Sequence, residues 1–114
     1  MSYQAKGLQA WLYQRLTAVF MVFYILYFLG VILTTQTMTY QQWVAWFSHP
    51  VMNTATGLFF LHLVVHAWVG MRDVVLDYMP NDTLRLITLA CISFFLTVSC
   101  LGMLRILFSL ALII

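Results

Sequence analysis

The chain has 114 residues, 64% of them hydrophobic and 17% aromatic, while only 7% carry a charge. A soluble domain normally has about 25% charged residues with which to cover its surface. The composition therefore excludes a soluble enzyme, a disordered chain and a basic nucleic-acid binder. It predicts an all-α membrane protein with a single domain over residues 1–114.

Charged residues are placed so that long stretches contain none. No Lys, Arg, Asp or Glu lies between Arg15 and Arg72, and Arg105 is the only charge after Arg85. The first of these stretches is long enough for two membrane spans of about 20 residues each and a loop. The pattern predicts three transmembrane helices with little chain outside the membrane, over about residues 16–35, 54–77 and 84–107.

The segment before the first span is polar, with Leu8, Trp11 and Leu12 as isolated apolar residues at helical spacing. No small-residue cleavage site follows a short apolar core, so the segment is not expected to be a signal peptide. The spacing predicts an N-terminal interfacial helix that lies on the membrane surface before the first span begins.

The connection between the first and second spans is polar but uncharged. Trp43, Trp46 and Phe47 lie at helical spacing within it. Tryptophan favours the membrane–water boundary because its ring is apolar and its N–H needs a partner. We expect a short interfacial helix that ends before His49 and Pro50, since the residue before a proline disfavours helical backbone.

The connection between the second and third spans sets the expected topology. It contains Pro80 and Asn81, which predict a turn, and Asp82 or Thr83 is expected to cap the third helix. Basic residues favour the cytoplasmic side of a membrane, so the N-terminus and this turn are predicted to be cytoplasmic. The basic residues that flank them are Lys6, Arg15, Arg72 and Arg85.

Five residues that are unusual in a membrane span share one face of the second span. At about 100° per residue they fall within about 80° of one another: His62, His66, Gly70, Asp73 and Asp77. Polar groups are costly in a membrane, so this polar stripe is expected to face protein, a cofactor or water. A histidine on it can hydrogen-bond a neighbouring helix, relay protons or bind a metal, and spacing does not choose among these roles.

Two histidines of the polar stripe, His62 and His66, lie one turn apart, so both could touch one small metal ion. They cannot be the two axial ligands of one haem, because axial ligands approach the iron from opposite sides. A haem ligand here therefore needs a partner from another chain. Gly70, one turn beyond His66, suits either the close approach of a flat macrocycle or simple contact with another helix.

Asp77 and Tyr78 at the end of the second span also allow two interpretations. An Asp at a helix end usually faces water, and a Tyr there often marks the membrane interface. Alternatively, a phenol that donates a hydrogen bond and a carboxylate that passes protons are the groups that quinone reduction requires.

The run HAWVGM at residues 66–71, followed by Asp77 and Tyr78, resembles the membrane anchor subunit of bacterial succinate dehydrogenase, the cytochrome b556 small subunit. The run RLTA at residues 15–18 resembles the start of that family's first span, and Thr39, Tyr40 and Trp43 resemble its first loop. The resemblance covers most of the chain. The family's three-span membrane-anchor domain with a cytoplasmic N-terminus agrees with the predicted spans.

The resemblance implies roles for five residues. His66 would be one axial ligand of the iron of haem b, with the second ligand from the large cytochrome b subunit. Arg15 would approach a haem propionate, and Gly70 would lie near the haem. Tyr78 would hydrogen-bond a carbonyl of ubiquinone, and Asp77 would lie beside it in the proton path.

The resemblance also implies a complex in the bacterial inner membrane, with a large cytochrome b subunit, an iron–sulfur subunit and a flavoprotein subunit. The chain would be a non-catalytic subunit that helps to carry electrons from succinate, in the tricarboxylic acid cycle, to ubiquinone. His62 departs from the family's pattern and has no implied ligand role, but it could hydrogen-bond across a helix interface. Arg72 and Asp73 are more charged than the family's pattern and could contact the iron–sulfur subunit.

Two other interpretations stay open. A haem-free quinone-binding anchor of the fumarate reductase type would keep the quinone role without a metal, although His66 on the polar stripe disfavours it. A small proton-relay transporter component should repeat the stripe on its other helices. The first span has no such stripe, and the third offers only Ser93 and Thr97.

Overall fold

The computed structural model describes residues 3–113, and the regular elements in that range are all helices. They are α1 (Tyr3–Thr35), α2 (Tyr40–Ser48), α3 (Pro50–Tyr78) and α4 (Asp82–Ala111). Among the described residues, three stretches are long and apolar enough to cross a membrane: Gly7–Thr35, Pro50–Tyr78 and Asp82–Ala111. Each is roughly 45 Å long, against about 30 Å for the hydrocarbon core. The predicted all-α architecture with three spans is confirmed.

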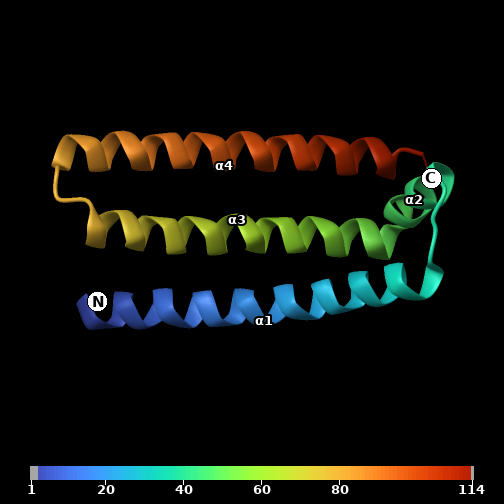
Figure 1. Cartoon of the computed structure of the whole chain (residues 1–114), viewed down its shortest axis with the longest axis horizontal. Helices are drawn as coiled ribbons and strands as arrows, with labels where there is room; N and C mark the ends of the chain where they lie inside the picture. Colours follow the sequence, from blue (N-terminus) through green and yellow to red (C-terminus); the bar gives the residue numbers. More distant parts are fainter. Residues whose placement is uncertain (1–2, 114) are drawn as a thin grey trace.

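The three long helices lie side by side in a row, with α3 in the middle (Figure 1). α3 packs against α1 on one side and against α4 on the other, whereas α1 and α4 do not contact each other in the described part of the chain. The short α2 lies at one end of the row and contacts α3 and α4. Because α3 has a helix on either side, its polar stripe can find partners within the chain.

The first helix is longer than the predicted span because it takes in the N-terminal segment. α1 begins at Tyr3 and runs without a break to Thr35. The segment expected to lie on the membrane surface therefore continues the axis of the span instead, and the spacing of its apolar residues fits either arrangement. At the other end, Gln36 adopts a positive φ of 63° and its N–H bonds the Ile32 carbonyl at 3.2 Å, which ends the helix.

α2 confirms the predicted short helix between the first two spans. It begins with a capping box, in which the Thr39 hydroxyl accepts from the Gln42 N–H and the Gln42 side chain accepts from the Thr39 N–H. One of its aromatic rings stacks on α1, since the centroids of Trp46 and Phe28 lie 5.4 Å apart. The cap and the stacking together secure α2 at the end of the row.

α3 begins at Pro50, earlier than the predicted start of the second span at residue 54. Proline suits the first helical position, because its missing N–H needs no partner there and its φ is already helical. His49 caps the same end, with its Nδ1 accepting from the Val51 N–H at 3.3 Å. Local backbone chemistry, rather than hydropathy, therefore decides where this helix starts.

The cap of α4 differs from the prediction. Asn81 caps the helix by accepting a hydrogen bond from the Leu84 N–H at 3.1 Å, so the expected caps Asp82 and Thr83 were wrong. The extended backbone of Asn81 suits a side-chain oxygen that reaches the first helical turn. Asp82 is already helical, and its carboxylate complements the positive end of the helix dipole instead.

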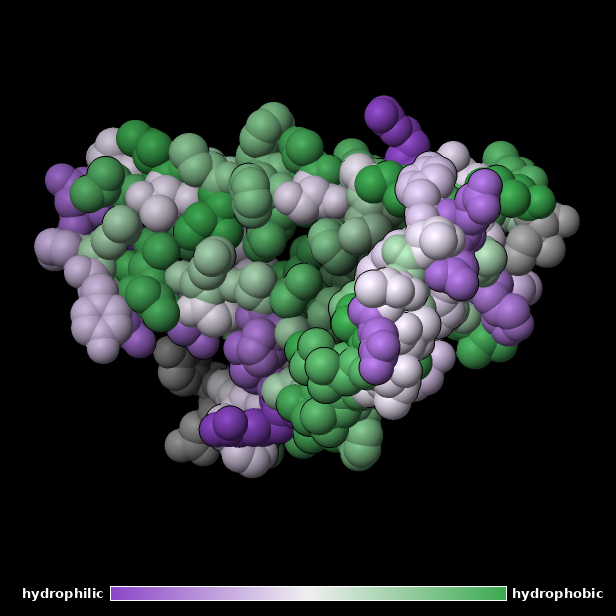
Figure 2. All heavy atoms as spheres, turned by 45° about the vertical axis from the view of Figure 1, so that its right-hand side comes forward, coloured by the Kyte–Doolittle hydropathy of each residue, from purple (hydrophilic) through white to green (hydrophobic). Residues whose placement is uncertain are grey.

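Few side chains are buried within the chain. Among the described residues, the buried apolar ones are Met52, Val75 and Leu107, and many large hydrophobic side chains are exposed. Figure 2 shows hydrophobic residues over much of the visible face, with hydrophilic residues gathered mostly toward its ends. A soluble monomer rarely exposes so much contiguous apolar surface. Lipid or other subunits are therefore expected to cover these faces.

One amide ties three helices together at the α2 end. Asn53 Nδ2 donates to the Phe47 carbonyl at 3.1 Å and to the Leu107 carbonyl at 3.0 Å, which joins α3 to α2 and α4. We expect Asn53→Leu to lower the free energy of unfolding by about 1–2 kcal/mol, because both hydrogen bonds are lost. The thermal unfolding of the detergent-solubilised complex measures this change. Gln41→Leu, on the exposed face of α2, is the control, and an equal loss in both variants would contradict the prediction.

Candidate functional site

The polar stripe of α3 faces α1. The Nδ1 atom of His66 lies 3.2 Å from the hydroxyl oxygen of Thr17, and Gln14 Nε2 donates to the His66 carbonyl at 3.3 Å. Thr17 is 2% exposed and His66 is half-buried. His66, at the centre of the stripe, is therefore held by α1 at both its ring and its backbone.

Gly70 and His62 lie on the same face of α3. A Cβ at Gly70 would lie 3.5 Å from Gln14 Nε2, which is ordinary van der Waals contact, so Gly70 lies against α1 without a steric need for glycine. The His62 ring lies 4.7 Å from the Phe20 ring, and its Nδ1 bonds the Leu58 carbonyl at 2.6 Å. The contact of His62 across the helix interface is therefore aromatic, and its Nδ1 is bonded within its own helix.

A cavity of about 610 Å³ lies between the first part of α1 and the last part of α3, and charges of both signs line it. Arg72 Nη2 lies 3.1 Å from Asp73 Oδ1, and both side chains of this ion pair are partly exposed, so they can still contact another subunit. Arg15 and Asp77 line the same cavity. The Arg15 Cζ lies 5.4 Å from the centroid of the Trp11 ring, in a cation–π contact that orients the guanidinium.

Tyr78 lies apart from the other predicted site residues. It ends α3 with 80% of its surface exposed, and it does not line the cavity. The other four predicted site residues lie between α1 and α3: Arg15, His66, Gly70 and Asp77. Gln14 links them, because it lines the cavity and also contacts His66 and Gly70 in the middle of the stripe. The phenol of Tyr78 is therefore left largely uncovered by the described part of the chain.

Two residues of α1, Gln14 and Thr17, contact the polar stripe and have no role in the sequence interpretation. Thr17 belongs to the RLTA run, but a threonine in an apolar helix commonly bonds a carbonyl of its own helix. The spacing of three residues places Gln14 and Thr17 on one face of α1, which is the one sequence signal that relates them. Their partner on α3 becomes visible only in the structure.

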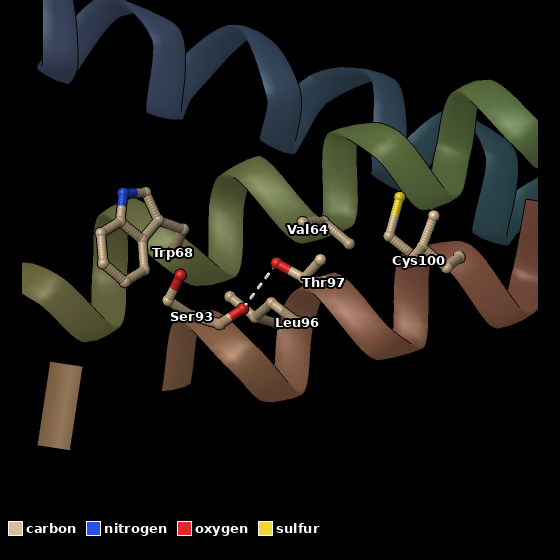
Figure 3. A pocket seen from close by; sticks show the side chains of 7 residues that line it. Val64, Trp68, Ser93, Leu96, Thr97 and Cys100 are labelled. Atoms are coloured by element: carbon tan, nitrogen blue, oxygen red, sulfur yellow. Dashed lines mark hydrogen bonds between the residues drawn. The ribbon is translucent and has the colours of Figure 1, made fainter. Parts of the chain in front are cut away.

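The opposite side of α3 carries an apolar groove against α4 (Figure 3). It has a volume of about 350 Å³, and among the described residues no Asp, His, Lys or Arg lines it. The Thr97 hydroxyl donates a hydrogen bond to the Ser93 carbonyl of the same helix at 2.8 Å. The ionisable groups of α3 that lie near another helix are therefore found on the α1 side.

Within residues 3–113 no group of three or more His, Cys, Asp or Glu side chains lies close enough to hold a metal ion. Cys91 and Cys100 are free thiols. A haem iron takes four ligands from its macrocycle, so a haem shared between two chains would require only one histidine from this chain.

The fold and the polar stripe define a small multi-pass membrane subunit whose ionisable groups gather on one face of its middle helix. Residues 1–100 match the succinate dehydrogenase/fumarate reductase transmembrane subunit family. The chain is also 34% identical, over 89 residues, to the succinate dehydrogenase hydrophobic membrane anchor subunit of Coxiella burnetii (strain RSA 493 / Nine Mile phase I), a match that covers 76% of this chain and 77% of that protein. The chain therefore belongs to the family of succinate dehydrogenase membrane anchor subunits.

Family membership confirms the resemblance inferred from the HAWVGM run. Members of this family are subunits, so the chain is expected to work in a complex with other proteins in a membrane. The small buried core agrees with this, because a chain with few buried side chains gains much of its stability from what covers it.

Proposed function

We propose that this chain is the hydrophobic anchor of a succinate:ubiquinone oxidoreductase complex in the bacterial inner membrane. It provides His66 as one axial ligand of haem b and contributes Asp77 and Tyr78 to the ubiquinone site. A large cytochrome b subunit supplies the second axial ligand, and iron–sulfur and flavoprotein subunits deliver electrons from succinate. The N-terminus is cytoplasmic, on the same side as the cavity lined by Arg15 and Asp77.

The observation that carries this proposal is the way in which α1 holds His66. With Nδ1 against the Thr17 hydroxyl, the other ring nitrogen, Nε2, is left for a ligand, and no residue in the described range hydrogen-bonds it. His66 also lies in the HAWVGM run that resembles the family, whereas His62 does not. The second axial ligand comes from another chain, because both histidines lie on the same side of α3.

The surroundings of His66 fit a group that carries carboxylates. Arg15 makes no ion pair within residues 3–113, so its guanidinium is available to a haem propionate. Gln14 Oε1 is buried with no hydrogen-bond partner in the described part of the chain. A buried acceptor needs a donor, so Gln14 Oε1 is expected to pair with an ordered water rather than with an ionised propionate, which can only accept. When bound, haem b supplies a centre that takes up and returns one electron.

The quinone role rests on the last two residues of α3. Reduction of a quinone to a quinol takes up two electrons and two protons, so its site must donate hydrogen bonds and provide a route for protons. The exposed phenol of Tyr78 can donate to a quinone carbonyl oxygen. Asp77 is the next residue in the chain and lines the α1–α3 cavity, where its carboxylate can pass protons inward from water.

A pull-down of the tagged chain in mild detergent, read by a reduced-minus-oxidised absorption spectrum, tests this function. We expect a b-type haem band that co-elutes with a flavoprotein and an iron–sulfur protein. The same partners without a haem band would contradict the ligand role of His66 and support a haem-free anchor of the fumarate reductase type. An intact preparation with neither haem nor redox partners would overturn both, and would leave the polar stripe as a proton relay.

A further inference from the structure

We propose that Thr17 is a positioning residue for the haem ligand. Its hydroxyl oxygen accepts a hydrogen bond from His66 Nδ1–H, which fixes the plane of the imidazole ring and leaves Nε2 unprotonated for the iron. This inference rests on the proposed function, since it concerns how α1 prepares His66 for a ligand role. It assigns a part in haem binding to a residue of the RLTA run for which the sequence interpretation gave no role.

The direction of this hydrogen bond follows from the surroundings of the Thr17 oxygen. Oγ1 lies 2.9 Å from the Tyr13 carbonyl oxygen, 3.0 Å from the Gln14 carbonyl oxygen and 3.2 Å from His66 Nδ1. A carbonyl oxygen cannot donate, so the single hydroxyl proton is drawn toward these two carbonyls. If the proton pointed at Nδ1, Oγ1 would face both carbonyl oxygens with no proton between them. Nδ1 therefore carries the ring proton and donates it to Oγ1.

The hydrogen bond between Thr17 and His66 is shielded from water. Thr17 is 2% exposed, so water has little access to its hydroxyl, and a hydrogen bond in such surroundings is stronger than one in water. On the same face of α1, Gln14 Nε2 donates to the His66 carbonyl at 3.3 Å. His62 differs, because its Nδ1 bonds the Leu58 carbonyl of its own helix. Of these two rings, that of His66 is the one held by a hydrogen bond to α1, whereas the His62 ring contacts α1 through the Phe20 ring.

A histidine that binds a metal usually anchors its second ring nitrogen, and loss of that anchor typically lowers metal affinity by about 10- to 100-fold. Thr17→Val keeps the branched shape of the side chain and removes only the hydroxyl. We therefore expect it to lower haem affinity by about 10-fold or more, and to change the spectroscopic signature and the midpoint potential of the haem that remains. Thr17→Ser keeps the hydroxyl and should restore all three.

The test uses the tagged chain in its assembled complex. Haem b per flavin, the EPR spectrum of the oxidised haem and its midpoint potential are measured for Thr17→Val and Thr17→Ser. Thr34→Val is the control for loss of a threonine hydroxyl from α1, because the exposed Thr34 donates to the Gly30 and Val31 carbonyls of the same helix, at 2.8 and 3.1 Å, and no hydrogen bond joins it to a histidine of the described residues. If Thr17→Val does not assemble, Thr17→Ala removes the hydroxyl without a bulky replacement. The spectra can also be recorded in whole membranes.

Unchanged haem content, EPR spectrum and potential in the hydroxyl-free variant would overturn this inference. So would a loss that Thr17→Ser does not restore, or an equal loss in Thr34→Val, since either would indicate packing alone. Comparison with His66→Ala separates the two levels of the proposal. If His66→Ala keeps an unaltered haem, the proposed ligand role fails. If His66→Ala loses its haem while Thr17→Val is unchanged, the ligand role stands and only the positioning role of Thr17 fails.

Discussion

Replacing His66 by alanine is expected to lower the haem b content of the assembled complex at least about tenfold, or to leave a five-coordinate haem that binds carbon monoxide. The substitution removes the nitrogen that α3 is proposed to give to the iron. A haem held by the axial ligand of the large cytochrome b subunit alone would be bound more weakly and would have an open coordination position. Difference absorption and EPR spectra, normalised to flavin, measure both outcomes.

His62→Ala is the matched control for this experiment, because His62 lies one turn away on the same polar stripe and is bonded within its own helix. Its haem content and EPR spectrum should equal those of the unaltered complex. Unchanged haem spectra and ligation in the His66 variant would reject His66 as the ligand. Loss of haem from the His62 variant instead would assign the ligand role to His62, one helical turn away.

Replacing Tyr78 by phenylalanine is expected to lower succinate–ubiquinone reductase activity about tenfold, because a hydrogen bond contributes up to about 1.5 kcal/mol and about 1.4 kcal/mol is tenfold in rate. The hydroxyl removed is the proposed donor to the quinone carbonyl. Since Tyr78 is 80% exposed, its replacement should leave the packing of α1 on α3 and the haem content unchanged. Activity is measured with ubiquinone and, separately, with a soluble dye that takes electrons before they reach the quinone.

Tyr40→Phe provides the control, because Tyr40 is 81% exposed and begins α2 at the opposite end of the helix row (Figure 1). This variant should keep full activity with both acceptors, whereas Tyr78→Phe should keep only the activity with the dye. Full succinate–ubiquinone activity in the Tyr78 variant would show that the quinone role of this residue is wrong.

The number and position of the spans are predictable from the sequence because they depend on properties of continuous segments. The uncharged stretch between Arg15 and Arg72 has room for two spans, and a lipid-exposed backbone must satisfy its polar groups within a helix. Helix ends are less predictable. The start of α3 at Pro50 and the cap of α4 at Asn81 depend on the backbone conformation of single residues, which hydropathy does not report.

The polar stripe shows how far periodicity leads at the candidate site. A regular helix places His66 and Asp77 on one face whatever surrounds it, so the stripe follows from spacing alone. Spacing does not show which helix covers this face, because α1 and α4 are both long and apolar. The structure assigns that place to α1, through the contacts of Gln14 and Thr17 with His66.

Arg85 also has one role that the sequence predicts and another that only the structure shows. In the sequence it is a basic residue that helps to predict topology. In the structure its guanidinium also donates to the Met79 carbonyl, at 2.6 and 3.1 Å, and lies 3.6 Å from Asp82, so that it braces the turn between α3 and α4.

By itself the sequence determined the class of protein, its three spans and its family, because composition, segment length and a contiguous motif are sufficient for each. Only the tertiary structure decided that Thr17 meets His66 and that Tyr78 lies outside the cavity that Asp77 lines. Both depend on how helices distant in the sequence pack together, and uniformly apolar helices carry little information about which of their faces will meet.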